Sequence, residues 1–278
     1  MIKPNKLNFC TSGIPLSTKK PNTIEGLKRV KELNLDGMEL EFVHSIHVKK
    51  EKTPEVNKTA KENDLMISCH APYYINLNAK EKPKWHASIS YIAQSAKITY
   101  LCNGYSVCFH PAFYMKDNPK DVYNKVKEAI KLILDNLKRD GVEIWMRPET
   151  AGKISQFGNI NKIINLSEEF ENVLPCIDWS HLHAYSNGKY NSEEEFKEVL
   201  SLMEKKLGRN ALNNVHFHCQ GVAYSEKGEK NHLNLKESDL NYIDLVKTWK
   251  EFKIKGIVVC ESPNVEADAK LLKELYYR

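Results

Sequence analysis

The feature that most constrains the fold is a regular alternation of short apolar segments with longer amphipathic ones along the whole chain. Strands that alternate with helices at this spacing form a parallel sheet, and eight such units are the number in a closed (β/α)8 barrel. The sequence therefore predicts an α/β TIM barrel that forms a single domain over residues 1–278. The expected strands are residues 7–10, 37–42, 65–70, 105–110, 143–148, 173–178, 214–218 and 256–261.

The expected helices are recognised by apolar residues three or four positions apart. The clearest example has Val122, Val126, Ile130, Leu134 and Leu137 on one face. The competing architecture is an open doubly wound sheet that binds a dinucleotide. It has little support, because the segment CTSGIP after the first strand contains one glycine instead of a GxGxxG turn. The eight helical stretches are TIEGLKRVKEL, TPEVNKTAKEN, WHASISYIAQSAKITYL, KDVYNKVKEAIKLILDNLKRD, INKIINLSEEF, SEEEFKEVLSLMEKKL, SDLNYIDLVKTWKEF and VEADAKLLKELYY.

Cysteine use and apolar content bear on the compartment. The 7 cysteines form no CxxC pair and are odd in number, so we expect reduced thiols and a cytoplasmic protein. The N-terminal segment MIKPNKLNF lacks the apolar stretch of a signal peptide, and no apolar run is long enough to span a bilayer, so we expect no membrane partner. The net charge of +5 permits a polyanionic partner without requiring one.

Histidines and carboxylates gather at the carboxyl ends of the expected strands. In a TIM barrel these ends form the mouth where active sites lie. Any one of these residues has a plain explanation as a hydrogen-bonding or capping group, but so many polar groups at one mouth would be costly to desolvate without a metal. The residues at or near strand ends are His70, His110, Glu149, Asp178, His181, His183, His216, His218 and Glu261, with His232 in the loop after the seventh strand.

This ligand chemistry indicates a metal-dependent hydrolase. Histidine and carboxylate ligands without cysteine suit Zn2+ or another first-row ion such as Mn2+, and their number exceeds what one tetrahedral ion needs. Two or more ions are therefore expected. Paired ions stabilise both the attacking and the leaving oxygen in phosphoester displacement, so phosphoester hydrolysis is the favoured chemistry.

Five motifs, in chain order, resemble one family. HAPYYINL at 70–77, FHP at 109–111, CIDWSH at 176–181, VHF at 215–217 and CES at 260–262 are similar to segments of the endonuclease IV class of apurinic/apyrimidinic endonucleases. That class belongs to the wider xylose-isomerase-like barrels.

The resemblance implies a TIM barrel with three Zn2+ ions that hydrolyses the phosphodiester 5′ to an abasic site in double-stranded DNA. We expect a monomer. Glu149 would bridge the first two ions, and Glu261 would orient or deprotonate the nucleophile. Tyr73 and Asn76 would contact the DNA. The implied ligands are His70 and His110 for the first ion, Asp178, His216 and Glu261 for the second, and His181 and His232 for the third.

The sequence departs from the family pattern at several places. Aligned on Thr-Ala-Gly, Glu149 is displaced by one residue, which would reverse its face on an ideal strand unless a bulge restores it. Lys230 stands where the family has the aspartate of the third ion, so Glu229, His218 or water would have to replace it. The family's early histidine is replaced around Cys10, and its DNA-reading loop becomes FVHSIHVKK. His183 is an extra candidate, either a ligand or a neighbour of one.

Two other functions remain open. A sugar isomerase or epimerase of the same superfamily would use one or two divalent ions and a pair of carboxylates to move a proton. The surplus of histidines argues against it. A barrel that binds metal and nucleic acid without cutting is the third possibility, and it is motivated by the departures above.

Overall fold

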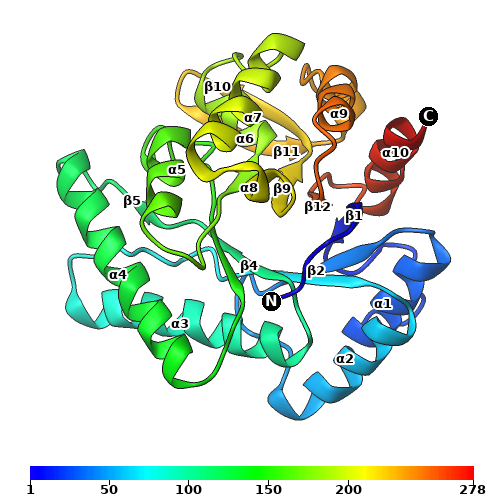
Figure 1. The fold of residues 1–278 in the computed structure, drawn as a ribbon, viewed down its shortest axis with the longest axis horizontal. Coiled ribbons are helices and arrows are strands. Elements are labelled where there is room, and N and C mark those ends of the chain that lie inside the picture. Colours follow the sequence, from blue (N-terminus) through cyan, green and yellow to red (C-terminus); the bar gives the residue numbers. More distant parts are fainter.

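The computed structural model describes all 278 residues and forms a parallel barrel inside a ring of helices (Figure 1). The predicted (β/α)8 barrel is confirmed. Its strands are β1 (Leu7–Ser12), β2 (Gly37–Glu41), β3 (Met66–His70), β4 (Ser106–Phe109), β6 (Trp145–Pro148), β8 (Cys176–Asp178), β9 (Val215–Cys219) and β12 (Gly256–Cys260).

Seven of the eight joins in the barrel are continuous strand ladders, and the eighth is a narrow seam. The sheet runs in the order β6-β4-β3-β2-β1-β12-β9-β8, with all pairs parallel. Between β6 and β8 the ring closes only through isolated bridges, Met146 to Val173 and Glu149 to Cys176.

Eight helices cover the outside of the barrel, and each overlaps a helical stretch expected from the sequence. Asparagine or serine side chains cap several of them; Ser192, for example, forms a capping box with Glu195 at the start of α7. None of the helices combines the length and apolar character that a membrane span needs. The eight are α1 (Thr23–Glu32), α2 (Thr53–Glu62), α3 (Lys82–Leu101), α4 (Pro119–Arg139), α5 (Ile160–Glu168), α7 (Glu193–Leu207), α9 (Tyr242–Glu251) and α10 (Glu266–Tyr277).

Several short elements were not expected from the sequence, and most of them follow the carboxyl ends of strands. β5 (Ala112–Phe113) follows β4 and pairs with β7 (Gln156–Phe157), which follows β6. Helix α6 (Trp179–Tyr185) begins directly after β8, and the hairpin of β10 (Gly221–Ser225) and β11 (Gly228–Leu233) follows β9. These additions build up the barrel mouth. The remaining short helices are η1 (Lys50–Lys52), α8 (Arg209–Leu212) and η2 (Leu235–Glu237).

The main apolar core lies between the barrel and its helices. On β9, Phe217 packs outward against Trp179 and Trp249, with ring centroids 5.4 Å and 6.1 Å away. Its neighbours His216 and His218 point the other way and contact Glu39 inside the barrel, because successive side chains of a strand face opposite sides. The interior of this barrel is therefore polar at the level where the strands end.

Candidate metal centre

A first ligand group forms around one oxygen of Glu149. The Nε2 atom of His70, the last residue of β3, lies 3.1 Å from Glu149 Oε2, and His110 Nδ1, just after β4, lies 3.4 Å from the same oxygen. Ligands on one tetrahedral ion with bonds near 2.0 Å are separated by about 3.3 Å. The three residues therefore have the spacing of ligands to one cation.

Glu149 reaches this position without a bulge. The pairing of β4 with β6 is unbroken through Phe109 and Pro148, and Arg147 also lies inside the barrel. Regular alternation then turns Glu149, two residues later, to the same inner side. The possible reversal of its face, which the sequence raised, does not occur.

A second ligand group uses the other oxygen of Glu149. His218 Nδ1 lies 3.3 Å from Glu149 Oε1 and 3.5 Å from Glu261 Oε1. Asp178 has a ligand oxygen within 4.8 Å of those of Glu149 and His218. These four residues come from the ends of β6, β8, β9 and β12, so the mouth of the barrel brings together segments far apart in the chain.

The histidine beside Glu149 and Glu261 is His218; His216, the ligand implied by the VHF motif, instead joins Glu39 and His218 in a deeper cluster whose spacing could also hold a cation. His216 lies one layer deeper, where its Nε2 contacts Glu39 and its Nδ1 is 2.9 Å from Ser106 Oγ. The signal was present in the sequence HFH: residues i and i+2 of a strand share a face, and the later one lies closer to the carboxyl end.

A third ligand group lies between α6 and β11. Glu229 Oε2 is 3.4 Å from His181 Nε2, and Glu229 Oε1 is 3.4 Å from His232 Nε2. Glu229 thus lies where its carboxylate could take the place of the one that Lys230 lacks, one of the replacements that the sequence left open. The hairpin contains a register shift between Ala223 and Tyr224, opposite this segment, so the pairing of β10 with β11 is irregular where Glu229 lies.

Backbone carbonyls orient three of the histidines. The Nδ1 atoms of His70, His181 and His232 contact the carbonyl oxygens of Ala71, Thr150 and Glu261 at 2.7, 3.0 and 3.1 Å. An Nδ1–H that donates to a carbonyl leaves the lone pair on Nε2. In His70 and His232 this Nε2 faces the carboxylate of a ligand group. In His181, Nε2 faces Glu229, and Nδ1 also lies 3.1 Å from Glu149 Oε1 and 3.2 Å from Asp178 Oδ2.

The charges of the centre are strongly coupled. Although burial opposes its ionisation, the imidazoles of His110 and His218 hold the pKa of Glu149 well below its ordinary value. Burial favours neutral His70, but the hydrogen bond and charge of Glu149 raise its pKa to about 10. Burial of His110 lowers its pKa to about 4. Protons on imidazoles thus balance the carboxylates in the metal-free protein, and cations could displace them.

Three buried polar atoms fit the presence of a cation. Glu149 Oε1, His110 Nδ1 and His218 Nδ1 are buried and have no hydrogen-bond partner. Buried polar atoms are normally paired, so unpaired ones that converge on one place call for a bound group. Mixed imidazole and carboxylate donors suit Zn2+ or Mn2+.

Some predicted site residues lie apart from the ligand groups. Both ring nitrogens of His183 are engaged elsewhere, with Lys189 O at 2.9 Å and Asp239 Oδ1 at 3.1 Å. Asn76 joins two loops, because its Oδ1 accepts hydrogen bonds from the backbone N–H groups of Asn78 and Phe113. Of the predicted DNA contacts, only Tyr73 presents an exposed side chain, at 53%.

Two acidic residues of β2 belong to the polar interior but were not among the residues expected there. Glu39 is fully buried and touches His216 and His218, and Glu41 accepts a hydrogen bond from Ser12 Oγ at 2.8 Å. The segment GMELE alternates apolar and acidic residues, which places both carboxylates on the inner face of the strand. That alternation was the available signal.

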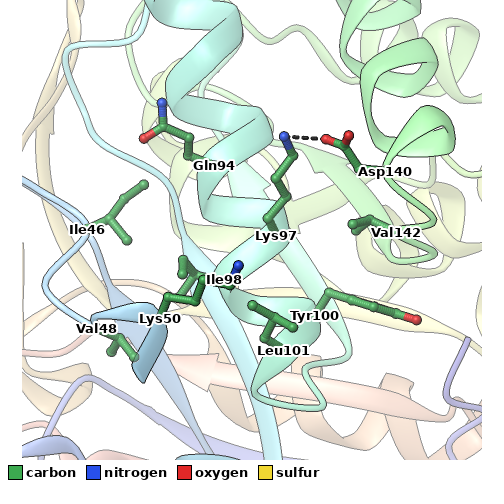
Figure 2. Close-up of a pocket in the computed structure, with 10 residues that line it drawn as sticks. All are labelled: Ile46, Val48, Lys50, Gln94, Lys97, Ile98, Tyr100, Leu101, Asp140 and Val142. Atoms are coloured by element: carbon green, nitrogen blue, oxygen red, sulfur yellow. Dashed lines mark ion pairs between the residues drawn. The ribbon is translucent and has the colours of Figure 1, made fainter. Parts of the chain in front are cut away.

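An apolar pocket on the outer wall is separate from the centre. Figure 2 shows that it is lined by residues of α3, such as Ile98 and Leu101, together with Ile46 and Val48, and that Lys97 pairs with Asp140 beside it. None of its lining residues belongs to the three ligand groups.

Known proteins with similar sequences include one of closely matching length. An uncharacterized protein of Methanocaldococcus jannaschii is 40% identical over 270 residues, which cover 97% of each chain. The protein named "Probable endonuclease 4" of Mycoplasma pneumoniae is 25% identical over 202 residues, or 70% of this chain and 67% of that one.

Solved structures share the fold at low sequence identity. Endonuclease IV from Thermus thermophilus has a TM-score of 0.73 at 16% identity, covering 98% of this chain and 99% of that one. A D-tagatose 3-epimerase-like protein has a TM-score of 0.74 at 14% identity, covering 96% and 97%. The family described as "Xylose isomerase-like TIM barrel" matches residues 27–276. With that match spanning nearly the whole barrel, the chain belongs to the xylose isomerase-like TIM barrel family.

Proposed function

We propose that the protein is a metal-dependent endonuclease that hydrolyses the phosphodiester 5′ to abasic sites in double-stranded DNA. One observation carries the proposal: the mouth holds three ligand groups, and the first two share Glu149. An enzyme that moves a proton on a sugar needs one or two cations. A phosphodiester has several oxygens, so it can be bound by three cations at once. The relative and the solved structure named for endonuclease IV support the same function.

Bound cations would stabilise the negative charge that develops on the phosphate and lower the pKa of the attacking water. The residues of the chain would have distinct parts in this reaction. Glu149 would hold the first two groups at a fixed separation, because its two oxygens face different histidines. Glu261 would orient the nucleophile or accept its proton; burial among Glu149 and Asp178 raises the pKa of its carboxyl group, which favours a proton acceptor.

The third group would bind the phosphate that is cleaved. His181 and His232 come from α6 and the hairpin, on the side of the mouth next to Asp178 and Glu261. Exposed Tyr73, which lies edge-on to His44 with centroids 5.4 Å apart, would contact the DNA beside the lesion. We take the enzyme to act as a cytoplasmic monomer with reduced thiols; its 7 cysteines are all buried and free.

The test is incision of a duplex that carries one tetrahydrofuran residue, after loading the protein with Zn2+ or Mn2+. We expect a nick 5′ to the lesion whose 3′-hydroxyl a polymerase can extend, and no nick in the undamaged duplex. Glu261→Gln should remove incision while the protein stays folded. Glu226→Gln, an exposed residue of the β10–β11 turn, is the matched control.

The alternative is epimerisation of a ketose at the same mouth. It is favoured by the pair of carboxylates Glu149 and Glu261, which flank His218 at 3.3 and 3.5 Å and could move a proton between two faces of a sugar. Turnover of a ketose, with no incision under any metal condition, would establish this function and overturn the endonuclease proposal.

A further inference from the structure

Glu39 lies directly beneath the second ligand group. Its Oε1 is 3.0 Å from His218 Nε2, and its Oε2 is 3.0 Å from His216 Nε2. Ser68 Oγ donates a hydrogen bond to Oε2 at 2.6 Å. All three side-chain partners are buried. A carboxylate in such a place must be matched by donors that hold it in one orientation.

His218 differs from the other histidines of the centre in what lies behind it. His70 and His232 place Nδ1 against a backbone carbonyl and turn Nε2 to a carboxylate of the mouth. His181 Nδ1 also contacts a carbonyl, but it lies 3.1 Å from Glu149 Oε1 and 3.2 Å from Asp178 Oδ2 as well. His218 is reversed: its Nε2 faces the Glu39 carboxylate, and its Nδ1, which has no hydrogen-bond partner, faces Glu149 and Glu261.

We propose that Glu39 is a positioning residue that holds the Nε2–H of His218 and so directs the Nδ1 lone pair toward the cation of the second ligand group. This inference rests on the metal centre of the proposed function. A carboxylate behind a metal-binding imidazole fixes its tautomer and makes the ligand nitrogen more basic than a carbonyl does. Among the ligand histidines described above, His218 has this arrangement, and it is the histidine of the group with the most carboxylates.

His216 completes the arrangement without being a ligand. Ser106 Oγ lies 2.9 Å from its Nδ1; in the tautomer in which the hydroxyl donates to this nitrogen, the ring proton lies on Nε2, 3.0 Å from Glu39 Oε2. Glu39 Oε2 accepts the hydrogen bond from Ser68 Oγ, whereas buried Oε1 has no partner apart from the His218 Nε2 that it faces at 3.0 Å. The two Nε2 atoms also lie 3.2 Å from each other, and the spacing of Glu39, His216 and His218 could itself hold a cation.

The test is the affinity of Glu39→Gln for Zn2+, measured by competition with a chromophoric chelator. A glutamine amide has one acceptor oxygen and an NH2 group that repels the second imidazole N–H. We expect affinity for the ion of the second group to fall by about 10–100-fold, the usual cost of losing such a partner. His216→Gln should keep the same number of bound ions and lose less affinity, and Glu226→Gln should match the wild type.

Nitrogen NMR gives a second readout, taken on the zinc-loaded wild-type protein. The His218 signal, assigned with His218→Gln, should show a proton on Nε2 and zinc on Nδ1. Zinc on Nε2 would overturn the proposal, and so would unchanged zinc affinity in Glu39→Gln. Loss of one whole ion in both Glu39→Gln and His216→Gln would instead make this layer a cation site. Failure to incise DNA would affect none of these measurements, so the two proposals fail separately.

Discussion

His218 on β9 pairs in register with Asp178 on β8, whereas His216 pairs with Cys176 one layer below. Register partners on neighbouring parallel strands lie side by side and face the same side of the sheet, so His218 and Asp178 enter the mouth as neighbours. This register decides which of two similar histidines belongs with the carboxylates of the second ligand group.

The first prediction compares these two histidines. His218→Ala should lower incision of the tetrahydrofuran duplex by more than about 100-fold, because a direct ligand matters more than the partner behind it. His216→Ala should retain most of the activity at saturating Zn2+. Rates measured at several zinc concentrations check both variants; equal losses in the two, with equal zinc dependence, would contradict the assignment.

The second prediction concerns the third ligand group. Glu229→Ala removes the carboxylate between His181 and His232, so we expect one fewer bound ion by elemental analysis and a higher KM for the DNA. Lys230→Ala is the matched control, because the Lys230 side chain is exposed. A full metal content in Glu229→Ala would show that water or another side chain completes this group.

The third prediction is a pH dependence of the metal-free protein. Burial beside Glu39 raises the pKa of Glu41 from 4.5 to about 8, so the folded state binds the extra proton between these values. Stability contributed by this group is therefore present below pH 4.5 and is lost as the pH rises to about 8. Glu41→Gln should be more stable than the wild type at about pH 9 and equal to it near pH 4.

Urea unfolding at about pH 4, 7 and 9 measures this difference directly. Glu226→Gln serves as the control, since an exposed carboxyl should give the same difference from the wild type at all three values. A constant difference for Glu41→Gln as well would mean that its carboxyl group ionises normally in the folded protein.

The fourth prediction separates stability from metal binding. Trp249 of α9 is fully buried and stacks at 6.1 Å from Phe217, on the outer face of β9. Trp249→Ala should lower the free energy of unfolding by about 3–5 kcal/mol through cavity formation. Zinc affinity of the folded protein should stay close to that of the wild type, because His218 lies on the opposite face. A large drop in affinity would show that the outer packing also sets the ligand geometry.

The fold was largely predictable because its signals are local. The apolar pattern of each segment predicts whether it forms a barrel strand or a covering helix. The carboxyl ends of the predicted strands then show which residues lie at the barrel mouth. His70, His110, Asp178 and Glu261 were found at the mouth on that basis alone. What remained hidden depends on contacts between distant segments.

Glu229, which the sequence offered only as one of several replacements, and Glu39, which it did not offer, illustrate the hidden part. Glu229 belongs to the third group only because the hairpin carries an irregular register and returns to α6, which no apolar pattern reveals. Glu39 belongs to the site because its side chain contacts His216 and His218 of β9 across the barrel interior. His183, in contrast, looked like a member of the cluster, but the turn of α6 directs it to Asp239.

The seam between β6 and β8 has a mechanical consequence. It is closed by isolated bridges rather than a ladder, and Glu149 and Asp178 stand on its two sides. A cation bound by both carboxylates would link β6 to β8 across the join of the barrel that has the fewest backbone hydrogen bonds. Metal binding would then also stabilise the closed barrel. The amide of Thr150, which donates a hydrogen bond to the carbonyl of Cys176 across this seam, would exchange more slowly in the metal-loaded protein.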